Sequence, residues 1–477
     1  MKIIGRNTEI DILKDSLSST ESKLIAVYGR RRVGKTFLIR QFYKKNLILD
    51  IAGLHKGSMK DQLLHFKNKL IKTGHKAAKQ EILKSWMQAF GLLEDYIDTI
   101  KTKGKKVIFI DELPWFDTPR SKFLMAFENF WNDYCSKRTD LIVVICGSAA
   151  AWMIKKIMKN KGGLHNRVSE KIKLMPFALK ETEDFLKNKG IRWSQYDIAQ
   201  LYMTVGGIPF YLNGIRKGES YTQYIDRVCF TNTGLLHDEF DELYSSLFDK
   251  SELHYNVIKA LGTVKAGITR TAVIEKANLK SGGTFTKIID ELVESGFITK
   301  FLPFDNNVNF CLYRLTDYFT LFYLKFMQHT KANGVGTWAV KTNSASWHSW
   351  AGLAFESICL QHIAQIKKAL SLTAIYTEVS SWKGVYEGNA AQVDLLIDRA
   401  DNVINFCEIK FAKDEFVITK SYAKELQQKM AVFAMQPNAK NKNIFLTMIT
   451  TRGTANNFYA KEMVQNKLVL KDLFVYV

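Results

Sequence analysis

The chain has 477 residues, enough for about three domains of ordinary size. Hydrophobic residues make up 47% of it and aromatic residues 12%, which excludes a largely disordered protein and allows several buried cores. Lysine and arginine number 68 against 47 aspartate and glutamate, and the resulting net charge of +21 favours polyanionic partners: nucleic acid, nucleotides or an anionic membrane.

The cellular location is indicated by three features. The amino-terminal residues lack the apolar stretch of a signal peptide, and the most apolar run, residues 141–154, is too short to span a bilayer. The six cysteines are scattered, with no CxxC pair, as is usual in a reducing compartment. We therefore expect a cytoplasmic protein with no membrane partner.

The first part of the chain, residues 1–236, alternates short apolar runs with amphipathic segments. Strands are predicted at residues 24–28, 107–110 and 141–145, and a helix at residues 123–134. Continuous apolar runs suit parallel strands covered on both faces, so the pattern predicts an α/β domain with a parallel sheet. From about residue 177 to residue 236 the pattern is mostly helical, as expected for a small lid.

The second part, residues 237–330, predicts a winged helix-turn-helix. Helices are expected at residues 255–261, 269–277 and 284–295, followed by a strand from residue 296, a turn at Asp305, Asn306 and Asn307, and a strand at residues 308–315. The third helix carries several acidic residues and few exposed basic ones, so DNA binding and a regulatory contact both stay open.

The third part, residues 331–477, predicts another α/β domain. It begins with a helix at residues 355–368, continues with strands at residues 393–397 and 403–409, and then returns to an α/β pattern. The whole chain is therefore predicted to be a multidomain α/β protein.

A phosphate-binding loop follows the first predicted strand. The pattern GxxxxGK[ST] is matched in full, with a strand before it and a helix after it, by Gly29, Arg30, Arg31, Arg32, Val33, Gly34, Lys35 and Thr36. The glycines let backbone N–H groups point at phosphates, and the helix that starts near Phe37 adds partial positive charge. Lys35 is expected to reach the β- and γ-phosphates and Thr36 to bind Mg²⁺.

Acidic and hydroxyl groups follow the next two predicted strands. Asp111 is expected to hold Mg²⁺ through water and Glu112 to orient the attacking water. Ser148 is placed to sense the γ-phosphate, with a simple turn serine as the alternative. Since no guanine-recognition NKxD motif is present, the sequence predicts an ATP site.

These motifs resemble the archaeal-type ATPases of the STAND/AAA+ superfamily. The resemblance rests on residues 29–36, on residues 111–115 (DELPW) and on residues 206–212 (GGIPFYL). It implies that Gly5 and Arg6 lie near the base, that Pro209 packs on adenine within a GxP lid motif, and that Arg167 is an arginine for the γ-phosphate or a neighbouring subunit. It also extends to the winged helix, and a homo-oligomer is left open.

A second group of charged residues lies in the third part. Asp394 heads one predicted strand, and Glu408 and Lys410 lie two residues apart on the next, which puts these two on one face. Two converging carboxylates suit Mg²⁺ or Mn²⁺, and a lysine beside them could position or deprotonate a water. Glu356, on the preceding helix, is a candidate further ligand. A solvated hairpin with a lysine–carboxylate contact is the alternative.

This pattern resembles the PD-(D/E)XK nuclease-like fold, in particular the C-terminal domain often attached to this ATPase family. We therefore expect an ATP-driven or ATP-gated enzyme that processes DNA, with the nucleotide state controlling the nuclease-like domain. The alternative is a STAND-type signalling or scaffold switch whose C-terminal domain binds without cutting. A helicase-like loader is a third possibility, but no series of helicase motifs supports it.

Overall fold

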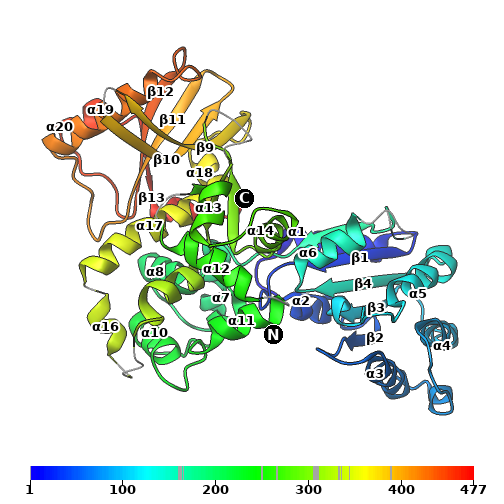
Figure 1. The fold of residues 1–477 in the computed structure, drawn as a ribbon. Helices are drawn as coiled ribbons and strands as arrows, with labels where there is room; N and C mark the ends of the chain where they lie inside the picture. The colour runs from blue at the N-terminus through cyan, green and yellow to red at the C-terminus, as the bar shows by residue number, and fades with distance from the viewer. Residues whose placement is uncertain are drawn as a thin grey trace. The chain divides into compact units, whose positions relative to one another are not determined.

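The computed structural model describes the chain except for residues 1, 160–163, 165, 249–250, 265–266, 305–310, 331–333, 335, 343 and 387–388, and the side chains of residues 385, 386, 389 and 390. The turn predicted at Asp305, Asn306 and Asn307 lies outside the described residues. The chain divides into two compact units, Met1–Pro176 and Phe177–Val477, which are described separately (Figure 1).

The first unit is built on a parallel sheet with the strand order β2-β3-β4-β1-β5. The strands are β1 (Lys23–Tyr28), β2 (Leu47–Ala52), β3 (Lys106–Asp111), β4 (Leu141–Gly147) and β5 (Glu170–Lys173). The three strands predicted from the sequence are confirmed. Because β3, β4 and β1 are neighbours and parallel, the segments that follow them meet at one edge of the sheet.

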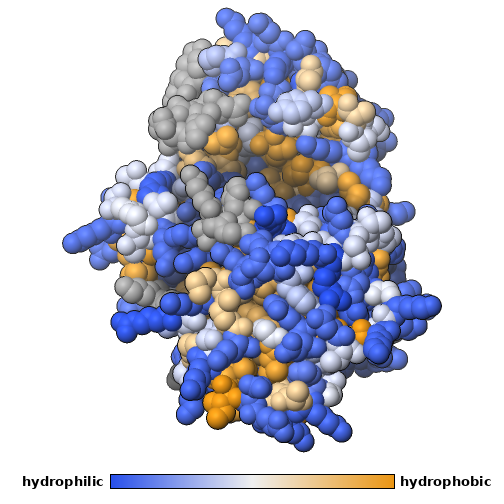
Figure 2. Space-filling view, turned by 90° about the vertical axis from the view of Figure 1, so that its right-hand side faces the viewer, coloured by the Kyte–Doolittle hydropathy of each residue, from blue (hydrophilic) through white to orange (hydrophobic). Residues whose placement is uncertain are grey.

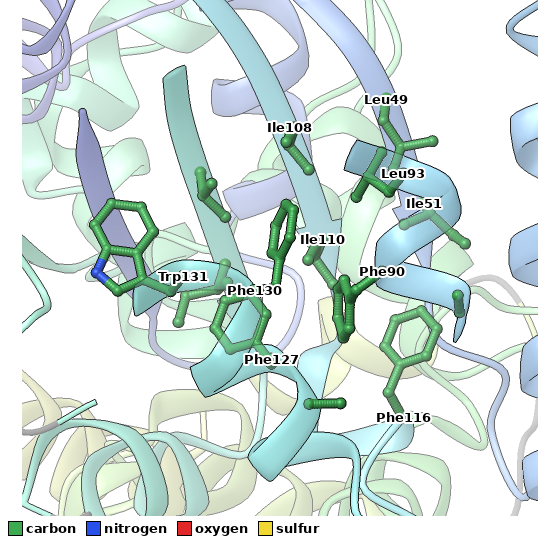
Figure 3. Packing of buried hydrophobic residues seen from close by; sticks show 14 of the residues in the cluster. Leu49, Ile51, Phe90, Leu93, Ile108, Ile110, Phe116, Phe127, Phe130 and Trp131 are labelled. Atoms are coloured by element: carbon green, nitrogen blue, oxygen red, sulfur yellow. The ribbon is translucent and has the colours of Figure 1, made fainter. Parts of the chain in front are cut away.

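Helices complete this unit, and aromatic side chains fill the core between helices and sheet. The helices are α1 (Asn7–Ser18), α2 (Lys35–Phe42), α3 (Met59–Lys72), α4 (Trp86–Thr99), α5 (Phe123–Asn129) and α6 (Ala150–Trp152). Phe90 of α4 stacks on Phe130 with ring centroids 4.9 Å apart (Figure 3). The helix predicted over residues 123–134 is present, but its last turn, Phe130–Tyr134, is a wider π-helical turn.

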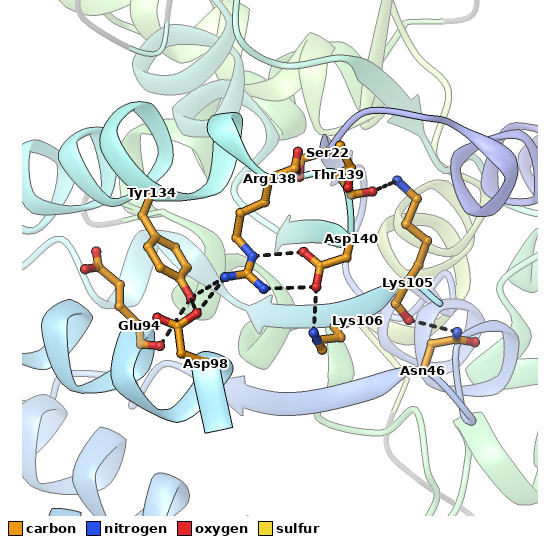
Figure 4. Close-up of polar contacts among 10 residues, drawn as sticks. All are labelled: Ser22, Asn46, Glu94, Asp98, Lys105, Lys106, Tyr134, Arg138, Thr139 and Asp140. Carbon is orange, nitrogen blue, oxygen red and sulfur yellow. Dashed lines mark hydrogen bonds and ion pairs between the residues drawn. The ribbon is translucent and has the colours of Figure 1, made fainter. Parts of the chain in front are cut away.

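A network of charges stabilises the amino ends of β3 and β4 (Figure 4). Arg138 donates hydrogen bonds to Asp140 and to Asp98, and Lys106 pairs with Asp140 at 2.6 Å. The hydrogen bonds from Arg138 hold the pKa of Asp140 well below its usual range. This network lies at the opposite end of β3 and β4 from Asp111 and Ser148, so we assign it a structural role.

The second unit opens with the helical segment predicted from the sequence. It contains α7 (Leu179–Asn188), α8 (Gln195–Val205), α9 (Pro209–Asn213), α10 (Tyr221–Cys229) and α11 (Glu239–Leu247). Gly207, just before α9, accepts a hydrogen bond from the Phe177 N–H at 2.7 Å. A Cβ atom at Gly207 would lie 1.9 Å from the Phe177 carbonyl oxygen, so only glycine allows this approach.

Three helices and a small antiparallel sheet follow. The helices are α12 (Ser251–Gly262), α13 (Arg270–Lys276) and α14 (Gly283–Glu294), and the sheet has the order β6-β8-β7, from β6 (Ile268–Thr269), β7 (Ile298–Phe301) and β8 (Leu312–Leu315). The predicted inner face of α14 is buried at Ile288, Ile289 and Leu292. The predicted elements therefore come in the predicted order, with β6 as an additional strand; residues 308–310 of the predicted last strand lie outside the described residues.

The last part of the second unit has a mixed five-stranded sheet of order β13-β12-β11-β10-β9. Its strands are β9 (Thr377–Tyr386), β10 (Asn389–Arg399), β11 (Val403–Lys410), β12 (Asn443–Thr450) and β13 (Asn466–Val469). β9, β10 and β11 are antiparallel, whereas β11, β12 and β13 are parallel. The accompanying helices are α15 (Tyr318–Phe322), α16 (Thr337–Lys341), α17 (Ala345–Gln361), α18 (Ile363–Ala369), α19 (Lys420–Ala434) and α20 (Phe458–Met463).

The helix predicted over residues 355–368 is wrong in both its start and its continuity. α17 begins ten residues earlier, where the Ser344 side chain caps it by accepting a hydrogen bond from the Trp347 N–H. The helix ends before His362, whose ring accepts the Leu179 N–H at 3.0 Å and bonds the Ile358 carbonyl oxygen. Of these contacts, the Ser344 cap is local, whereas the bond between Leu179 and His362 is made by the tertiary fold, which a local pattern does not record.

The surface is strongly polar, in keeping with the net charge of +21. The face shown in Figure 2 is mostly hydrophilic, with smaller hydrophobic areas between. Within the described part of the chain, no helix has both the length and the apolar character needed to cross a membrane.

Candidate functional site

The phosphate-binding loop lies between β1 and α2, as the motif predicts. Gly29 has a φ of 139°, and a Cβ atom there would lie 2.4 Å from the Leu174 carbonyl oxygen. Gly34 has a φ of 94° and precedes the first residue of α2. Both positions therefore require glycine: Gly29 for its φ and for the close Leu174 carbonyl oxygen, and Gly34 for its φ alone.

Lys35 is buried and lies across the loop. Its Nζ atom donates hydrogen bonds to the carbonyl oxygens of Gly29 at 2.9 Å and Arg30 at 2.8 Å. The ammonium group is thus held inside the curve of the loop, where phosphate oxygens would be stronger acceptors than these neutral carbonyls. Among the neighbouring residues of the loop, Val33 is buried, Arg31 and Arg32 are half-buried, and Phe37 is exposed.

Thr36 and Asp111 come together at the edge of the sheet. The Thr36 hydroxyl donates a hydrogen bond of 2.6 Å to the Asp111 carboxylate. A hydroxyl and a carboxylate oxygen side by side are hard oxygen donors, which suit Mg²⁺. The pair fits the predicted site for a magnesium ion carried by a nucleotide.

Glu112 has an unusual backbone and a well-defined side chain. Its φ of 44° and ψ of 51° place it in the left-handed region, which is costly for a residue with a Cβ. Its N–H donates to Asp111 at 3.0 Å, and its carboxylate accepts hydrogen bonds from the N–H and hydroxyl of Ser148. Ser148 is therefore a direct partner of Glu112.

Arg6 also reaches the loop. It is buried, and its Nη2 atom donates to the Val33 carbonyl oxygen at 3.2 Å, while Nη1 lies 3.8 Å from Glu9. Gly5, with a φ of 63°, precedes it. The segment before α1 is therefore joined to the phosphate loop, which the loop motif by itself did not indicate.

Arg167 and Pro209 are the remaining predicted nucleotide contacts. Arg167 is exposed in the turn before β5, and its N–H bonds the Leu164 carbonyl oxygen at 3.0 Å. Pro209 is the first residue of α9 and belongs to the second unit. Both residues remain predictions as nucleotide contacts.

In the second unit, β10 and β11 form the predicted hairpin, and Glu408 is the most constrained acid on it. Its Oε1 atom lies 2.9 Å from Lys410 Nζ and 3.6 Å from Lys429 Nζ, and accepts a hydrogen bond of 2.6 Å from the Tyr422 hydroxyl. Burial alone would raise the pKa of Glu408, but the two lysines outweigh it and lower the pKa. Glu408 is thus an ionised carboxylate whose negative charge is balanced by the two lysines.

Glu356 of α17 lies within electrostatic range of the hairpin acids. Burial, together with the charge of Asp394, raises the pKa of Glu356 to about 7, against the opposing charges of Arg314 and Lys410. Arg314 Nη2 of β8 lies 3.8 Å from Glu356 and donates to the Ser357 hydroxyl at 3.1 Å. This pKa indicates that Glu356 changes its charge near neutral pH.

Asp394 is half-buried and accepts a hydrogen bond of 2.8 Å from the Gln392 side chain. Across the residues that the structure describes, no three Asp, Glu, His or Cys side chains are grouped closely enough to hold a metal ion. The predicted ligands Glu356, Asp394 and Glu408 are therefore near one another without forming one ligand set, because Glu408 is directed to its lysine and tyrosine partners.

Sequence reasoning missed three residues at this second site: Arg314, Tyr422 and Lys429. Tyr422 and Lys429 are seven residues apart on α19, a spacing that puts them on one helix face. This spacing was the only sequence signal that the two residues could contact the same acid. Arg314 reaches Glu356 from a different sheet. The sequence holds no local signal for that contact.

Comparisons with known proteins agree with the geometry of the first site. Residues 3–215 match a family described as an ATPase domain predominantly from Archaea. An uncharacterised protein of Methanocaldococcus jannaschii is 24% identical over 417 residues, 86% of this chain and 87% of that protein. An uncharacterised ATP-binding protein of the same organism is 40% identical over 45 residues, 9% of this chain and 76% of that protein.

Among solved structures, a Walker-type ATPase of Pyrococcus abyssi is similar with a TM-score of 0.50 and 17% identity, covering 68% of this chain and 96% of that one. This likeness concerns the fold alone. The fold and the loop geometry define a multidomain α/β protein with a P-loop ATPase-like core. Through residues 3–215 the chain belongs to the family of ATPase domains found predominantly in Archaea.

Proposed function

We propose that the chain binds and hydrolyses ATP with Mg²⁺ at the phosphate loop. The observation that carries this proposal is the meeting of three contacts at one sheet edge: Lys35 with the loop carbonyls, Thr36 with Asp111, and Glu112 with Ser148. Phosphoryl transfer depends mainly on positioning and charge stabilisation, which such a set supplies.

Each residue has a defined part in this proposal. Lys35 binds the β- and γ-phosphates, and Thr36 and Asp111 hold Mg²⁺, which would neutralise charge on the phosphates when bound. Glu112 orients the attacking water, and Ser148 keeps the Glu112 carboxylate in place. Gly5, Arg6 and Pro209 are proposed to line the base, and Arg167 to approach the γ-phosphate.

The rest of the chain is proposed to act on DNA under control of the nucleotide. We divide the whole chain into residues 1–236 as the ATPase core with its lid, 237–330 as the winged helix, and 331–477 as the PD-(D/E)XK nuclease-like domain. Support comes from the antiparallel β10–β11 hairpin and from the shared electrostatics of Glu356, Asp394, Glu408 and Lys410. Lys410 is proposed to position water beside the carboxylates.

A second candidate is a STAND-type switch whose C-terminal domain binds without cutting. The specific observation in its favour is the Glu408 carboxylate, already bonded by Tyr422 and flanked by Lys410 and Lys429. A carboxylate neutralised in this way is a poorer metal ligand, because the metal must displace its lysine partners. Glu356, Asp394 and Glu408 would then stabilise the domain without binding a metal.

One experiment separates the two candidates. Labelled single- and double-stranded DNA is incubated with the full chain in Mg²⁺, with and without ATP, and compared with Lys35→Ala and Asp394→Ala. ATP-controlled cleavage is supported if the chain cuts DNA, Asp394→Ala abolishes the cutting and Lys35→Ala alters it. ATP hydrolysis without any cutting supports the switch. If Lys35→Ala hydrolysed ATP as fast as the unaltered chain, the nucleotide site itself would be refuted.

A further inference from the structure

A pocket of about 390 Å³ lies in the second unit beside the C-terminal carboxylates. Its walls come from the small sheet β6–β8–β7, from the carboxyl-terminal part of α17, and from strands β9 and β10. Asp394 and its hydrogen-bonded neighbour Gln392 belong to the lining, and so does Arg314. The pocket therefore adjoins the groups proposed above to act on a phosphodiester.

Hydrogen bonds tie these walls together at separate points. The Phe304 N–H donates to the Ser381 carbonyl oxygen at 2.9 Å, which joins the segment after β7 to β9. Arg314 of β8 donates to the Ser357 hydroxyl of α17 at 3.1 Å. Because separate elements are linked around it, the pocket is pre-formed, as ligand pockets usually are.

One aromatic ring of the lining lies against a glycine. A Cβ atom at Gly267 would be 2.5 Å from the Phe301 ring, so glycine at this position leaves room for the ring beside the pocket. Trp382 of β9 also borders the pocket, but its ring packs on Phe433 in the hydrophobic core, with ring centroids 5.3 Å apart. Leu312 adds further apolar surface. The pocket suits a flat group with apolar faces.

Polar and charged groups are spaced between these apolar surfaces. Hydroxyls of Thr299 and Thr316 can both donate and accept hydrogen bonds. Arg314 and Lys383 bring two positive charges to the lining and Asp394 one negative charge, and Arg314 is also 3.8 Å from Glu356, so Lys383 is the cation left to meet a phosphate. A nucleotide has this combination of features: an apolar base face, a hydrogen-bonding base edge and an anionic phosphate.

We propose that this pocket binds one unpaired base of a single DNA strand, whose backbone passes Lys383 toward Asp394. The inference rests on the proposed nucleic-acid function of the C-terminal part and names its substrate as single-stranded DNA. A pocket of this volume has room for one nucleotide. Since a base must leave the duplex to enter, single strands bind more tightly than duplexes.

The first test is binding without cleavage. Fluorescence anisotropy of a labelled oligothymidylate and of a matched duplex is measured in EDTA with the full chain. Lys383→Glu, and Thr299→Trp as a filling variant, are each expected to weaken single-strand binding about tenfold, the value of one stacked base. Lys440→Glu is the matched control, because this exposed lysine precedes β12, at the opposite end of the sheet from Glu408. It should change affinity less than about twofold.

The second test locates the base directly. An oligonucleotide with one 5-iodouracil is irradiated with the protein, and the attached peptide is identified by mass spectrometry. Attachment to the peptide containing Phe301 or Lys383 supports the pocket. Attachment only elsewhere, equal effects of Lys383→Glu and Lys440→Glu, or equal affinity for duplex and single strand would overturn it.

The two proposals fail separately. If the chain never cuts DNA, but Asp394→Ala still binds single strands in a way that depends on Lys383, the pocket proposal stands and the nuclease proposal fails. If cutting depends on Asp394, but single-strand binding is insensitive to both Lys383→Glu and Thr299→Trp, the nuclease proposal stands and the pocket proposal fails. Thermal unfolding and ATP binding equal to those of the unaltered chain show that each variant is folded.

Discussion

The carboxylate of Glu112 accepts two hydrogen bonds from Ser148, one from the backbone N–H at 3.0 Å and one from the hydroxyl at 2.9 Å. Glu112 follows β3 and Ser148 follows β4, so the contact joins two neighbouring strands at the edge where the phosphate loop lies. A carboxylate that orients water needs a defined position, and two donors on one residue provide it.

Replacement of Ser148 by alanine should therefore lower the rate of ATP hydrolysis and leave ATP binding nearly intact. The backbone N–H bond remains, so we expect kcat to fall about ten- to a hundredfold, within the usual range for a disturbed general base. Steady-state hydrolysis gives kcat, and titration with a fluorescent ATP analogue gives affinity. Ser136→Ala, at an exposed serine, is the control. An unchanged kcat in Ser148→Ala would show that the Ser148 hydroxyl does not position Glu112 for hydrolysis.

The Thr36–Asp111 pair leads to a prediction about magnesium. Thr36→Ala removes the hydroxyl that lies 2.6 Å from Asp111, whereas Thr36→Ser keeps it. We expect Thr36→Ala to need about tenfold more Mg²⁺ for half-maximal ATP hydrolysis, since one oxygen ligand is lost. Thr36→Ser should stay close to the unaltered chain. The measurement is hydrolysis rate against Mg²⁺ at constant ATP, and identical curves for both variants would exclude Thr36 as a ligand.

The parts of this structure that the sequence predicted are those with local signals. The strand ahead of Gly29, the loop to Thr36 and the acids after β3 depend on short-range pattern and spacing, and all are in place. The bounds of α17 were missed because Trp347, Trp350 and other apolar residues lie on several of its faces, which leaves no clear amphipathic period.

The contacts that the sequence did not predict join residues far apart along the chain. Arg314 and Glu356 are 42 positions apart and belong to a strand and a helix of different layers. The direction of Glu408 depends on Tyr422 and Lys429 of α19, which packs against β10 and β9. Tertiary packing decides these partners, so composition and periodicity cannot identify them.

Gly207 gives a prediction about stability. An alanine there would place its Cβ atom 1.9 Å from the Phe177 carbonyl oxygen, and backbone atoms cannot yield as a side-chain tip can. We expect Gly207→Ala to destabilise the second unit by at least about 2 kcal/mol, as overpacking against backbone does. The measurement is the midpoint of urea unfolding followed by circular dichroism.

Gly352→Ala is the matched control for this substitution. Gly352 lies in α17, and a Cβ atom there would have no neighbour within 4 Å. Alanine favours a helix over glycine by about 1 kcal/mol, so the control should be neutral or slightly stabilising. Equal midpoints for Gly207→Ala and the unaltered chain would show that the Phe177 segment moves freely to accept the methyl group.

His362 gives the last prediction, which concerns pH. Burial lowers the pKa of His362 to about 4, and its neutral ring links the Leu179 N–H to the Ile358 carbonyl oxygen. An unfolded chain takes up a proton at this histidine near pH 6.5, whereas the folded chain does so only near pH 4. The stabilisation is therefore complete above pH 6.5 and is lost as the pH falls toward 4, by at most about 3 kcal/mol. His362→Gln should flatten that part of the stability profile, measured as the urea midpoint from pH 4 to 8, whereas His348→Gln, at an exposed histidine of α17, should not. If both variants keep the slope of the unaltered chain, His362 does not stay neutral in the folded protein.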